Sequence, residues 1–532
     1  MTYVITRGCC TDASCVTVCP VDCIHPRPGE VDYGTTEILY VDADVCIDCG
    51  ACADACPVKA IKPADMLKSD ELVFLDINAD FYRDRPPVEP NHEHTWDRMG
   101  PTRTGKPLQV AIVGTGPSAS YATRTLLLST DSRVTILDRA VMAGGFVRSA
   151  VAPDHGGTKK FIGTFDWLHR HPRAAMYMNV TVGKDISHEE LLKFHDAVIY
   201  GVGADQERLL GVPGADLPSV YSAHDVVRWY NANEFVRPND ISVKSGRVVI
   251  IGNGNVALDI ARILLTDPAK LRSTEISHNA LAEIARADVN EVVILGRRGP
   301  ADASFTRPEL LTMGAGIDVE IHKDPQTLED LNAAAPGSKA AVLAKLPTFA
   351  GDLATEPAPG KRAVFVFGAN LAAVNGSNGV ETVAMRMADA DIDIPAGTVV
   401  VSIGHRGSPI AGLPFDDQTG TVPNEQGRVV DPVTGEPVRG AYVVGWIKRG
   451  AQGGIGINRG DSQETILTLL NDLNDPAVRS TVGSVRAFGR YLRRRVSHHV
   501  TRRVMRRLDA AERMAGEPEG HPRQKQASST NT

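Results

Sequence analysis

The stretch that decides the fold reads VAIVGTGPSA at residues 110–119, where an apolar run leads into a glycine-rich turn. A short buried strand that passes through G-x-G-x-x-A into a helix is the fingerprint of a dinucleotide-binding βαβ unit. Gly114 permits the tight turn, Gly116 lets backbone amides approach a pyrophosphate, and the small Ala119 allows the helix to pack closely on the strand. The stretch therefore predicts a nucleotide at the start of that helix.

A second copy of the fingerprint, VVIIGNGNVA, occupies residues 248–257. The two copies differ where the next apolar run ends, because the first has Asp138 there and the second has Arg297 and Arg298. A carboxylate can accept hydrogen bonds from ribose hydroxyls, whereas two guanidiniums can hold a 2′-phosphate through charge-assisted hydrogen bonds. The second nucleotide is therefore expected to be NADP(H). The alternation of apolar runs with glycine-rich turns predicts an α/β fold with parallel sheets.

All nine cysteines lie within the first 56 residues. Residues 46–57 read CIDCGACADACP, the bacterial ferredoxin pattern in which three closely spaced thiolates hold one cluster and the fourth serves another. Residues 15–20, CVTVCP, supply the reciprocal pair. A zinc site is the alternative, but zinc modules usually present two separated cysteine pairs. We therefore assign a 4Fe-4S cluster to Cys19, Cys46, Cys49 and Cys52.

The second cluster site is irregular, because residues 9–19 read CCTDASCVTVC in place of a second C-x2-C-x2-C-x3-C run. The three thiolates that remain suit a 3Fe-4S cluster, and residues 3–6 and 19–23 resemble seven-iron ferredoxins, in which the cysteine at the Cys23 position is not a ligand. A 4Fe-4S cluster that uses both Cys9 and Cys10 is the alternative. Adjacent residues rarely direct both side chains at one cluster, which favours the set Cys9, Cys15 and Cys56.

Composition and charge narrow the class of protein. With 42% apolar and 23% charged residues, the 532-residue chain is expected to form two to four globular domains. No window approaches ~18 unbroken apolar residues, and residues 1–7 lack a charged-then-apolar leader, so we expect no membrane span and a cytoplasmic location. Residues 1–65 hold ten acidic and four basic side chains, which makes the cysteine-rich segment acidic.

The end of the chain is basic, with thirteen Lys and Arg against four Asp and Glu from Arg479 onward. Apolar side chains recur among these arginines at roughly helical spacing, which favours a solvated or packing helix over a docking surface for an acidic ferredoxin. No recognised reader fold accompanies the arginines, so nucleic acid is not an expected partner.

Together these motifs resemble the adrenodoxin reductase type of ferredoxin–NADP reductase, in particular its bacterial members with a fused N-terminal ferredoxin. The resemblance covers nearly the whole chain. It implies an α+β bacterial ferredoxin domain at 1–65, a linker at 66–105, and two Rossmann-like domains. The FAD domain would comprise 106–240 and 390–475, the NADPH-binding domain would be inserted at 241–389, and a basic segment would follow at 476–532. The stretches that carry the resemblance are 114–117, 146–148, 151–155, 252–259, 296–300, 402–404 and 445–450.

The resemblance also implies the site residues. His155 and Trp446 are the candidate catalytic residues beside the flavin. Those implied to line FAD are Gly114, Gly116, Ser118, Asp138, Gly145, Val147, Trp446, Gly453, Gly454 and Ile455. Those implied to hold NADP are Asn253, Gly254, Asn255, Val256, Arg297, Arg298, Glu309 and Gly453.

The chain departs from the family pattern near His155. Family members usually carry a second acid, in an E-L-R-E stretch, that pairs with this histidine. Here residues 309–312 read ELLT, so the acid is replaced by Thr312. An ordinary structural role for His155 is therefore as well supported as a proton relay.

The function implied is a reductase that passes electrons from NADPH through FAD to the fused iron–sulfur clusters, and then to a ferredoxin or to acceptor proteins such as haem monooxygenases. FAD converts pairs of electrons into single ones, and the linker would make docking of the ferredoxin domain intramolecular. We expect that deleting residues 1–65 spares reduction of a small dye by NADPH. The alternative is a non-catalytic electron-carrier subunit of a larger redox complex.

Overall fold

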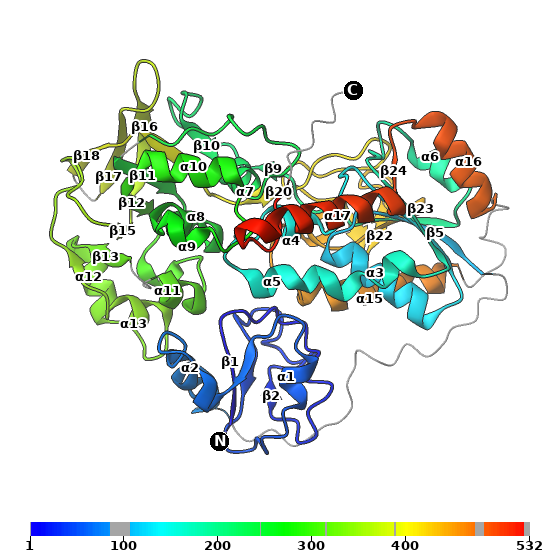
Figure 1. Ribbon diagram of the computed structural model, residues 1–532, viewed down its shortest axis with the longest axis horizontal. Coiled ribbons are helices and arrows are strands. Elements are labelled where there is room, and N and C mark those ends of the chain that lie inside the picture. Colours follow the sequence, from blue (N-terminus) through cyan, green and yellow to red (C-terminus); the bar gives the residue numbers. More distant parts are fainter. Residues whose placement is uncertain are drawn as a thin grey trace.

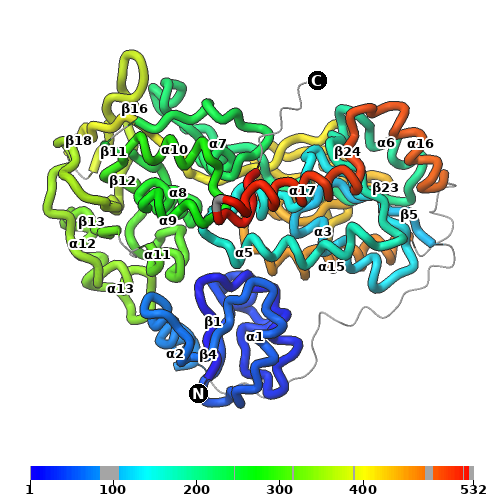
Figure 2. Tube along the Cα trace, viewed as in Figure 1, coloured from blue at the N-terminus to red at the C-terminus, as the bar shows by residue number. Residues whose placement is uncertain are grey.

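The computed structural model describes residues 2–83, 85, 107–244, 246–313, 317–387, 390–473 and 483–525. Two lobes built on sheets stand side by side, and a small N-terminal module, residues 2–83, lies beneath them and contacts both (Figures 1 and 2). In this module two antiparallel strand pairs pack with helix α2. Its elements are β1 (Tyr3–Ile5), β2 (Ile24–His25), β3 (Tyr40–Val41), α1 (Ala51–Ala55), β4 (Ile61–Pro63), η1 (Ala64–Met66) and α2 (Val73–Arg83).

The first lobe contains an eight-stranded sheet with a parallel centre, in the order β21-β22-β23-β8-β5-β6-β7-β24. The strand that contains the first fingerprint, β5, is buried along its whole length, and helices α3 (Pro117–Ser129) and α15 (Ile457–Asp472) pack against each other. The strands are β5 (Gln109–Val113), β6 (Arg133–Asp138), β7 (Ala174–Met178), β8 (Ala197–Tyr200), β21 (Asn424–Glu425), β22 (Arg428–Val430), β23 (Pro437–Val443) and β24 (Val500–Thr501).

The second lobe contains a fully parallel seven-stranded sheet, in the order β10-β19-β11-β12-β15-β13-β14, and a three-stranded antiparallel sheet, β16-β17-β18. The strands are β10 (Val220–Ser222), β11 (Gly246–Ile251), β12 (Val289–Leu295), β13 (Asp318–His322), β14 (Thr348–Phe349), β15 (Arg362–Val366), β16 (Asn370–Asn375), β17 (Thr382–Met387), β18 (Ala390–Pro395) and β19 (Thr398–Val401). The helices are α7 (Ala223–Tyr230), α8 (Asn255–Leu265), α9 (Pro268–Leu271), α10 (His278–Ala287), η4 (Pro300–Asp302), α11 (Arg307–Met313), α12 (Pro325–Asn332) and α13 (Lys339–Leu343).

The predicted fold class is confirmed: the chain is α/β, and its second lobe is inserted into the first, because the chain leaves the first sheet after β8 and rejoins it at β21. The sheets divide the chain at other residues than the predicted boundaries. Strands β10 and β19, expected in the first lobe, pair in the seven-stranded sheet. Helix α2 lies within the range predicted as a linker, and residues 84 and 86–105 of that range lie outside the described residues.

The basic C-terminal segment packs on both lobes. Strand β24 pairs with β7 at the edge of the first sheet, and Phe488 and Leu492 of the preceding helix are buried. The last helix then crosses in front of the two lobes (Figure 1). We call residues 502–525, this helix and the segment after it, the C-terminal strap. The elements of the segment are α16 (Val485–Arg495), α17 (Arg502–Gly516) and η5 (Glu517–Glu519).

Short elements complete the fold. None of the helices within the described ranges is long and apolar enough to span a membrane. The short elements are α4 (Gly145–Ser149), α5 (Gly156–Lys160), η2 (Phe161–Phe165), η3 (Leu168–Arg170), α6 (His188–Leu192), β9 (Gln206–Glu207), β20 (His405–Arg406) and α14 (Trp446–Arg449).

Candidate functional site

One cleft of about 2120 Å³ runs between the two lobes and reaches the N-terminal module. A pocket for a drug-sized ligand measures about 300–1,000 Å³, so this cleft has room for more than one such ligand. Every residue implied to line FAD or to hold NADP is found along it, as are the candidate catalytic pair His155 and Trp446. Of the predicted metal ligands, Cys9 also borders the cleft.

The first glycine of each fingerprint closes its turn in the same way. Gly114 has φ +112°, and a Cβ there would lie 2.3 Å from the carbonyl oxygen of Gly201. Gly252 has φ +109°, and a Cβ there would lie 2.2 Å from the carbonyl oxygen of Ser402. Both positions therefore require glycine, for the backbone conformation and for the close approach of a neighbouring strand end.

The helices that follow the two fingerprints begin without a side-chain cap. Their N-cap residues are Gly116 for α3 and Gly254 for α8, whereas α7 and α10 are capped by Ser222 and Ser277. Both glycines line the cleft. Uncapped N–H groups and the positive end of a helix dipole suit a phosphate, so these residues fit the pyrophosphates of two dinucleotides.

The residues expected to distinguish the two nucleotides also lie on the cleft. Asp138 accepts hydrogen bonds from the Thr115 hydroxyl at 2.5 Å and from the Ala140 N–H at 2.8 Å, and its burial raises the pKa of the carboxyl group. Arg297 and Arg298 are exposed at the end of β12, and neither guanidinium has an ion-pair partner within the described residues. Two such cations in a cleft suit an anionic ligand.

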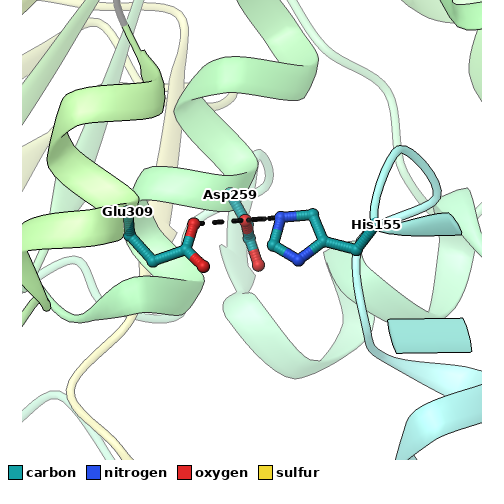
Figure 3. Close-up of side chains that lie close together, drawn as sticks. All are labelled: His155, Asp259 and Glu309. Carbon is teal, nitrogen blue, oxygen red and sulfur yellow. Dashed lines mark ion pairs between the residues drawn. The ribbon is translucent and has the colours of Figure 1, made fainter. Parts of the chain in front are cut away.

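A cluster of charged groups surrounds His155, as Figure 3 shows. The His155 Nε2 atom lies 3.2 Å from Asp259 Oδ1, 3.8 Å from Glu309 Oε2 and 2.8 Å from Arg262 Nη2. Burial by itself would raise the pKa of Asp259, but the charges of His155 and Arg262 hold it well below its ordinary value. The acid missing at Thr312 thus has a counterpart in Asp259, which the sequence analysis did not single out.

The sequence analysis also missed Arg7 of the N-terminal module. Its Nε and Nη2 atoms donate to Glu309 Oε2 at 3.0 and 2.7 Å, and Nη2 also contacts His155 Nε2. Because the guanidiniums of Arg7 and Arg262 already neutralise the carboxylates of Glu309 and Asp259, this group does not suit a metal ion. No local signal marks Arg7, since it meets Glu309 only when the module docks on the second lobe.

Most of the nine thiols are buried in the N-terminal module, and several lie close enough to influence one another. Burial, followed by the charges of Cys46, Cys19 and Cys49, raises the pKa of Cys52 to about 11. Burial and the neighbouring Cys9 and Cys56 raise the pKa of Cys15. Cys10 lies close to Cys9 and Cys56, and Cys23 Sγ lies 3.5 Å from Cys19 Sγ.

Backbone N–H groups point at several of these sulfurs. Cys9 Sγ accepts from the N–H groups of Thr11 at 3.4 Å and Leu39 at 3.5 Å. Cys56 Sγ accepts from Ala60 at 3.2 Å and Cys19 Sγ from Cys23 at 3.4 Å. Such hydrogen bonds stabilise thiolate charge, so the residues present fit cluster ligands.

The module contacts the first lobe through the segment that carries Cys9 and Cys10. The N–H of Gly456 donates to the Cys10 carbonyl at 2.8 Å, and a Cβ on Gly454 would lie 3.7 Å from Thr11 Oγ1. Any side chain at Gly456 would collide with the Thr11 carbonyl, because a Cβ there would lie 1.8 Å from its oxygen. We call this contact the glycine seat, residues 453–456.

The fold and the cleft define a two-lobed dinucleotide-binding oxidoreductase with an iron–sulfur module at its N-terminus. A family model described as a 4Fe-4S binding domain matches residues 39–62. A "Probable ferredoxin/ferredoxin--NADP reductase" of Mycobacterium tuberculosis is 41% identical over 99% of this chain and 93% of its own length. The chain therefore belongs to the ferredoxin–NADP reductase family, in the group that carries a ferredoxin domain.

Relatives without the N-terminal module match the two lobes. The "NADPH-ferredoxin reductase FprA" of Mycobacterium tuberculosis is 40% identical over 80% of this chain and 98% of its own length. The solved structure "Mycobacterium tuberculosis FprA in complex with NADPH" superposes with a TM-score of 0.72, at 38% identity, and covers 80% of this chain and 98% of that one. The predicted adrenodoxin reductase type is thereby confirmed.

Proposed function

We propose that the chain binds NADPH and FAD in the cleft, passes electrons from NADPH through FAD to its own iron–sulfur module, and delivers them to redox partner proteins. The observation that carries the proposal is the meeting of three features in one cleft. Both uncapped helix N-termini open into it, Arg297 and Arg298 border it, and the Cys9–Cys10 segment is docked against its glycine seat.

The nucleotide residues have separate roles in this proposal. FAD, when bound, would accept the two electrons of a hydride together and pass them on one at a time. Asp138 accepts from its ribose, and the α3 N-terminus faces its pyrophosphate. Arg297 and Arg298 select NADPH by its 2′-phosphate, and the α8 N-terminus faces the second pyrophosphate. The remaining residues proposed for FAD are Ser118, Gly145, Val147, Trp446, Gly453, Gly454 and Ile455, and those for NADP are Asn253, Asn255, Val256, Glu309 and Gly453.

The module holds two clusters in this proposal. Cys19, Cys46, Cys49 and Cys52 bind the 4Fe-4S cluster, and Cys9, Cys15 and Cys56 bind a 3Fe-4S cluster. The two hydrogen bonds to Cys9 Sγ support Cys9 over Cys10 as the ligand. A 4Fe-4S cluster that uses both residues is the alternative.

The two ligand sets face different surroundings. Cys9 and Cys10 border the cleft, whereas Cys49 is exposed and follows a loop that carries Asp42, Asp44 and Asp48. Exposed Val45 and Ile47 lie in the same loop. An apolar patch rimmed by acids suits an acceptor protein with a basic surface, so we propose that ferredoxin-dependent acceptors, haem monooxygenases among them, dock around Cys49.

Spectroscopy of the anaerobically purified protein tests the proposed cluster types and their cysteine ligands. Electron paramagnetic resonance of the oxidised protein is expected to show a three-iron signal, and NADPH is expected to bleach the flavin and reduce both clusters. Cys9→Ser should abolish the three-iron signal, while Cys10→Ser, its matched control, should retain it. Retention in both variants, or loss in both, would contradict the ligand assignment.

Turnover distinguishes the reductase from a non-catalytic carrier subunit. The purified chain alone should reduce ferricyanide with NADPH, because its own cleft supplies both nucleotide sites. A protein that contains flavin and sulfide but shows no turnover with NADPH would exclude the reductase.

A further inference from the structure

Arg7 of the N-terminal module forms ion pairs with Asp259 and Glu309 of the second lobe at the nucleotide cleft. It follows β1, only 20% of its side chain is exposed, and it borders the cleft. Its partner Glu309 lies on α11 of the second lobe, 302 positions away in the chain. The module therefore contributes a side chain to the wall of the nucleotide cleft, which the two lobes alone would leave without this cation.

The contacts of Glu309 leave one of its oxygens available. Oε2 accepts both hydrogen bonds from Arg7, whereas Oε1 accepts none from the residues that the structure describes. Glu309 lines the cleft, and its side chain is 12% exposed. Arg7 thus holds the carboxylate in one orientation, with an acceptor left free for a ligand.

A second unpaired group lies beside it. The Nη1 atom of Arg262 is buried without a hydrogen-bond partner in the described structure and lies 3.8 Å from Glu309 Oε2. Buried donors are almost always satisfied. Arg262 does not itself border the cleft, so its charge acts on a ligand through Asp259 and Glu309.

Charge balance in the cluster depends on Arg7. Three carboxylates, those of Asp154, Asp259 and Glu309, face the two guanidiniums of Arg7 and Arg262 around His155. Without Arg7, one guanidinium would remain for three acids. Glu309 would then lose both hydrogen bonds that hold its carboxylate in one orientation.

We propose that Arg7 is a positioning residue for the nicotinamide half of NADPH: it orients Glu309, so that the iron–sulfur module completes the nucleotide site from which it is reduced. The assignment to the nicotinamide half follows from position, since Glu309 lies at His155, where the module and both lobes meet, whereas Arg297 and Arg298 serve the 2′-phosphate. This inference rests on the proposed function.

Equilibrium titration of the full-length holoprotein with two probes tests the proposal. NADP⁺ reaches both ends of the site, whereas adenosine 2′,5′-bisphosphate carries only the 2′-phosphate end. Arg7→Gln is expected to weaken NADP⁺ binding roughly tenfold, the loss of one charged hydrogen-bond pair, and to leave the adenosine 2′,5′-bisphosphate affinity unchanged. Arg7→Lys should restore part of the loss, and Arg297→Ala should weaken both probes.

A matched control separates positioning from docking. Glu37 of the module accepts from the Arg307 N–H at 3.0 Å and from Arg307 Nε at 2.9 Å, which forms a further ion pair between the module and the second lobe. Glu37→Gln should weaken NADP⁺ binding less than twofold. Equal losses in Arg7→Gln and Glu37→Gln, an unchanged NADP⁺ affinity in Arg7→Gln, or equal weakening of both probes by it would overturn the proposal. If the unmodified protein bound neither probe, the proposed function itself would fail.

Discussion

His195 is a buried imidazole whose hydrogen bonds fix its neutral form. It precedes β8 and is 1% exposed, and its Nδ1–H donates to the Leu191 carbonyl at 2.9 Å while Nε2 accepts from the Thr135 hydroxyl at 2.8 Å. The ring of Phe488 from the C-terminal segment packs edge-on against it. Burial is the main cause that lowers the pKa of His195 to about 4.

This histidine should make the stability of the first lobe depend on pH. Because the folded-state pKa lies below the ordinary value of 6.5, the unfolded chain binds more protons between pH 4 and 6.5, and stability falls as the pH drops through that window. The loss from this group alone reaches about 3 kcal/mol. His195→Asn, which cannot be protonated, should flatten the fall of Tm between pH 6.5 and 4 in differential scanning fluorimetry. Parallel curves for both proteins would contradict the assignment.

Residue identity alone could not have predicted the cluster around His155. The family resemblance points to His155 and Glu309, but the position where the family carries the partner acid holds Thr312 in this chain. Asp259 takes that place because α8 turns it toward His155. Arg7 joins the cluster only through the docked module, and no spacing in the sequence encodes that contact.

At the scale of elements, the two glycines of the second fingerprint have different roles, one in stability and one in nucleotide binding. Gly252 has a positive φ and no room for a Cβ, whereas Gly254 has φ −82° and open space, with no atom within 4 Å of where a Cβ would lie. Gly252→Ala should therefore lower the Tm of the protein and cost about 2 kcal/mol or more of stability. Gly254→Ala should leave Tm unchanged but raise the KM for NADPH, since its methyl group would enter the space before the α8 N-terminus.

Thermal melts and NADPH–ferricyanide kinetics on the same preparations measure both effects. Gly211→Ala, at another glycine with open space around a Cβ, is the matched control and should change neither quantity. A fall in Tm for Gly254→Ala that matches that of Gly252→Ala would show that the two positions are not distinguished as we describe.

The elements that sequence could predict are those with local signals. A buried strand, a glycine turn and a helix follow one another within about ten residues in both fingerprints, and the cysteine pattern is equally compact. The pairing of β10 and β19 in the second sheet, and of β24 with β7, joins segments far apart in the chain. Such pairings depend on tertiary packing, which periodicity does not report.

Across the whole molecule, the C-terminal strap connects the two lobes through buried charges. Glu512 of α17 pairs with Arg148 at 2.6 Å, and Arg523 and Lys525 pair with Glu275 of the second lobe at 3.4 and 3.2 Å. Burial lowers the pKa of Lys525 to about 8, although Glu275 opposes this shift. The basic tail is therefore a packed structural segment over residues 502–525.

Removal of residues 517–532 should loosen the contact between the lobes. The truncation would leave Glu275 without Arg523 and Lys525, its partners from the strap. Removing one member of a buried ion pair lowers the free energy of unfolding by about 3 kcal/mol or more, so we expect Tm to fall by roughly 5–10 °C. Scanning calorimetry of the truncated holoprotein measures this change. Arg513→Ala, which removes an exposed pair with Asp509 on the same helix, should have little effect. A truncated protein with the Tm of the full chain would contradict the role of the strap.

The docking of the module also changes the expectation for its deletion. Buried apolar residues of the module and of the first lobe form one continuous core cluster, and Arg7 reaches the nucleotide site. We therefore expect that a chain without residues 1–65 still reduces dyes but binds NADPH more weakly. If the module and the lobes were independent domains, the deletion would leave dye reduction unchanged.

The glycine seat has a consequence for which acceptor proteins the reductase can serve. The Thr11 carbonyl is packed against Gly456, and under the proposed function the N-terminal module therefore occupies the place where a separate carrier would approach the flavin. We then expect electrons to leave through the exposed surface around Cys49, so that residues 1–65 determine which acceptor protein is reduced. Replacing residues 1–65 by a different iron–sulfur domain on the same two lobes should therefore change the acceptor protein while NADPH remains the electron donor.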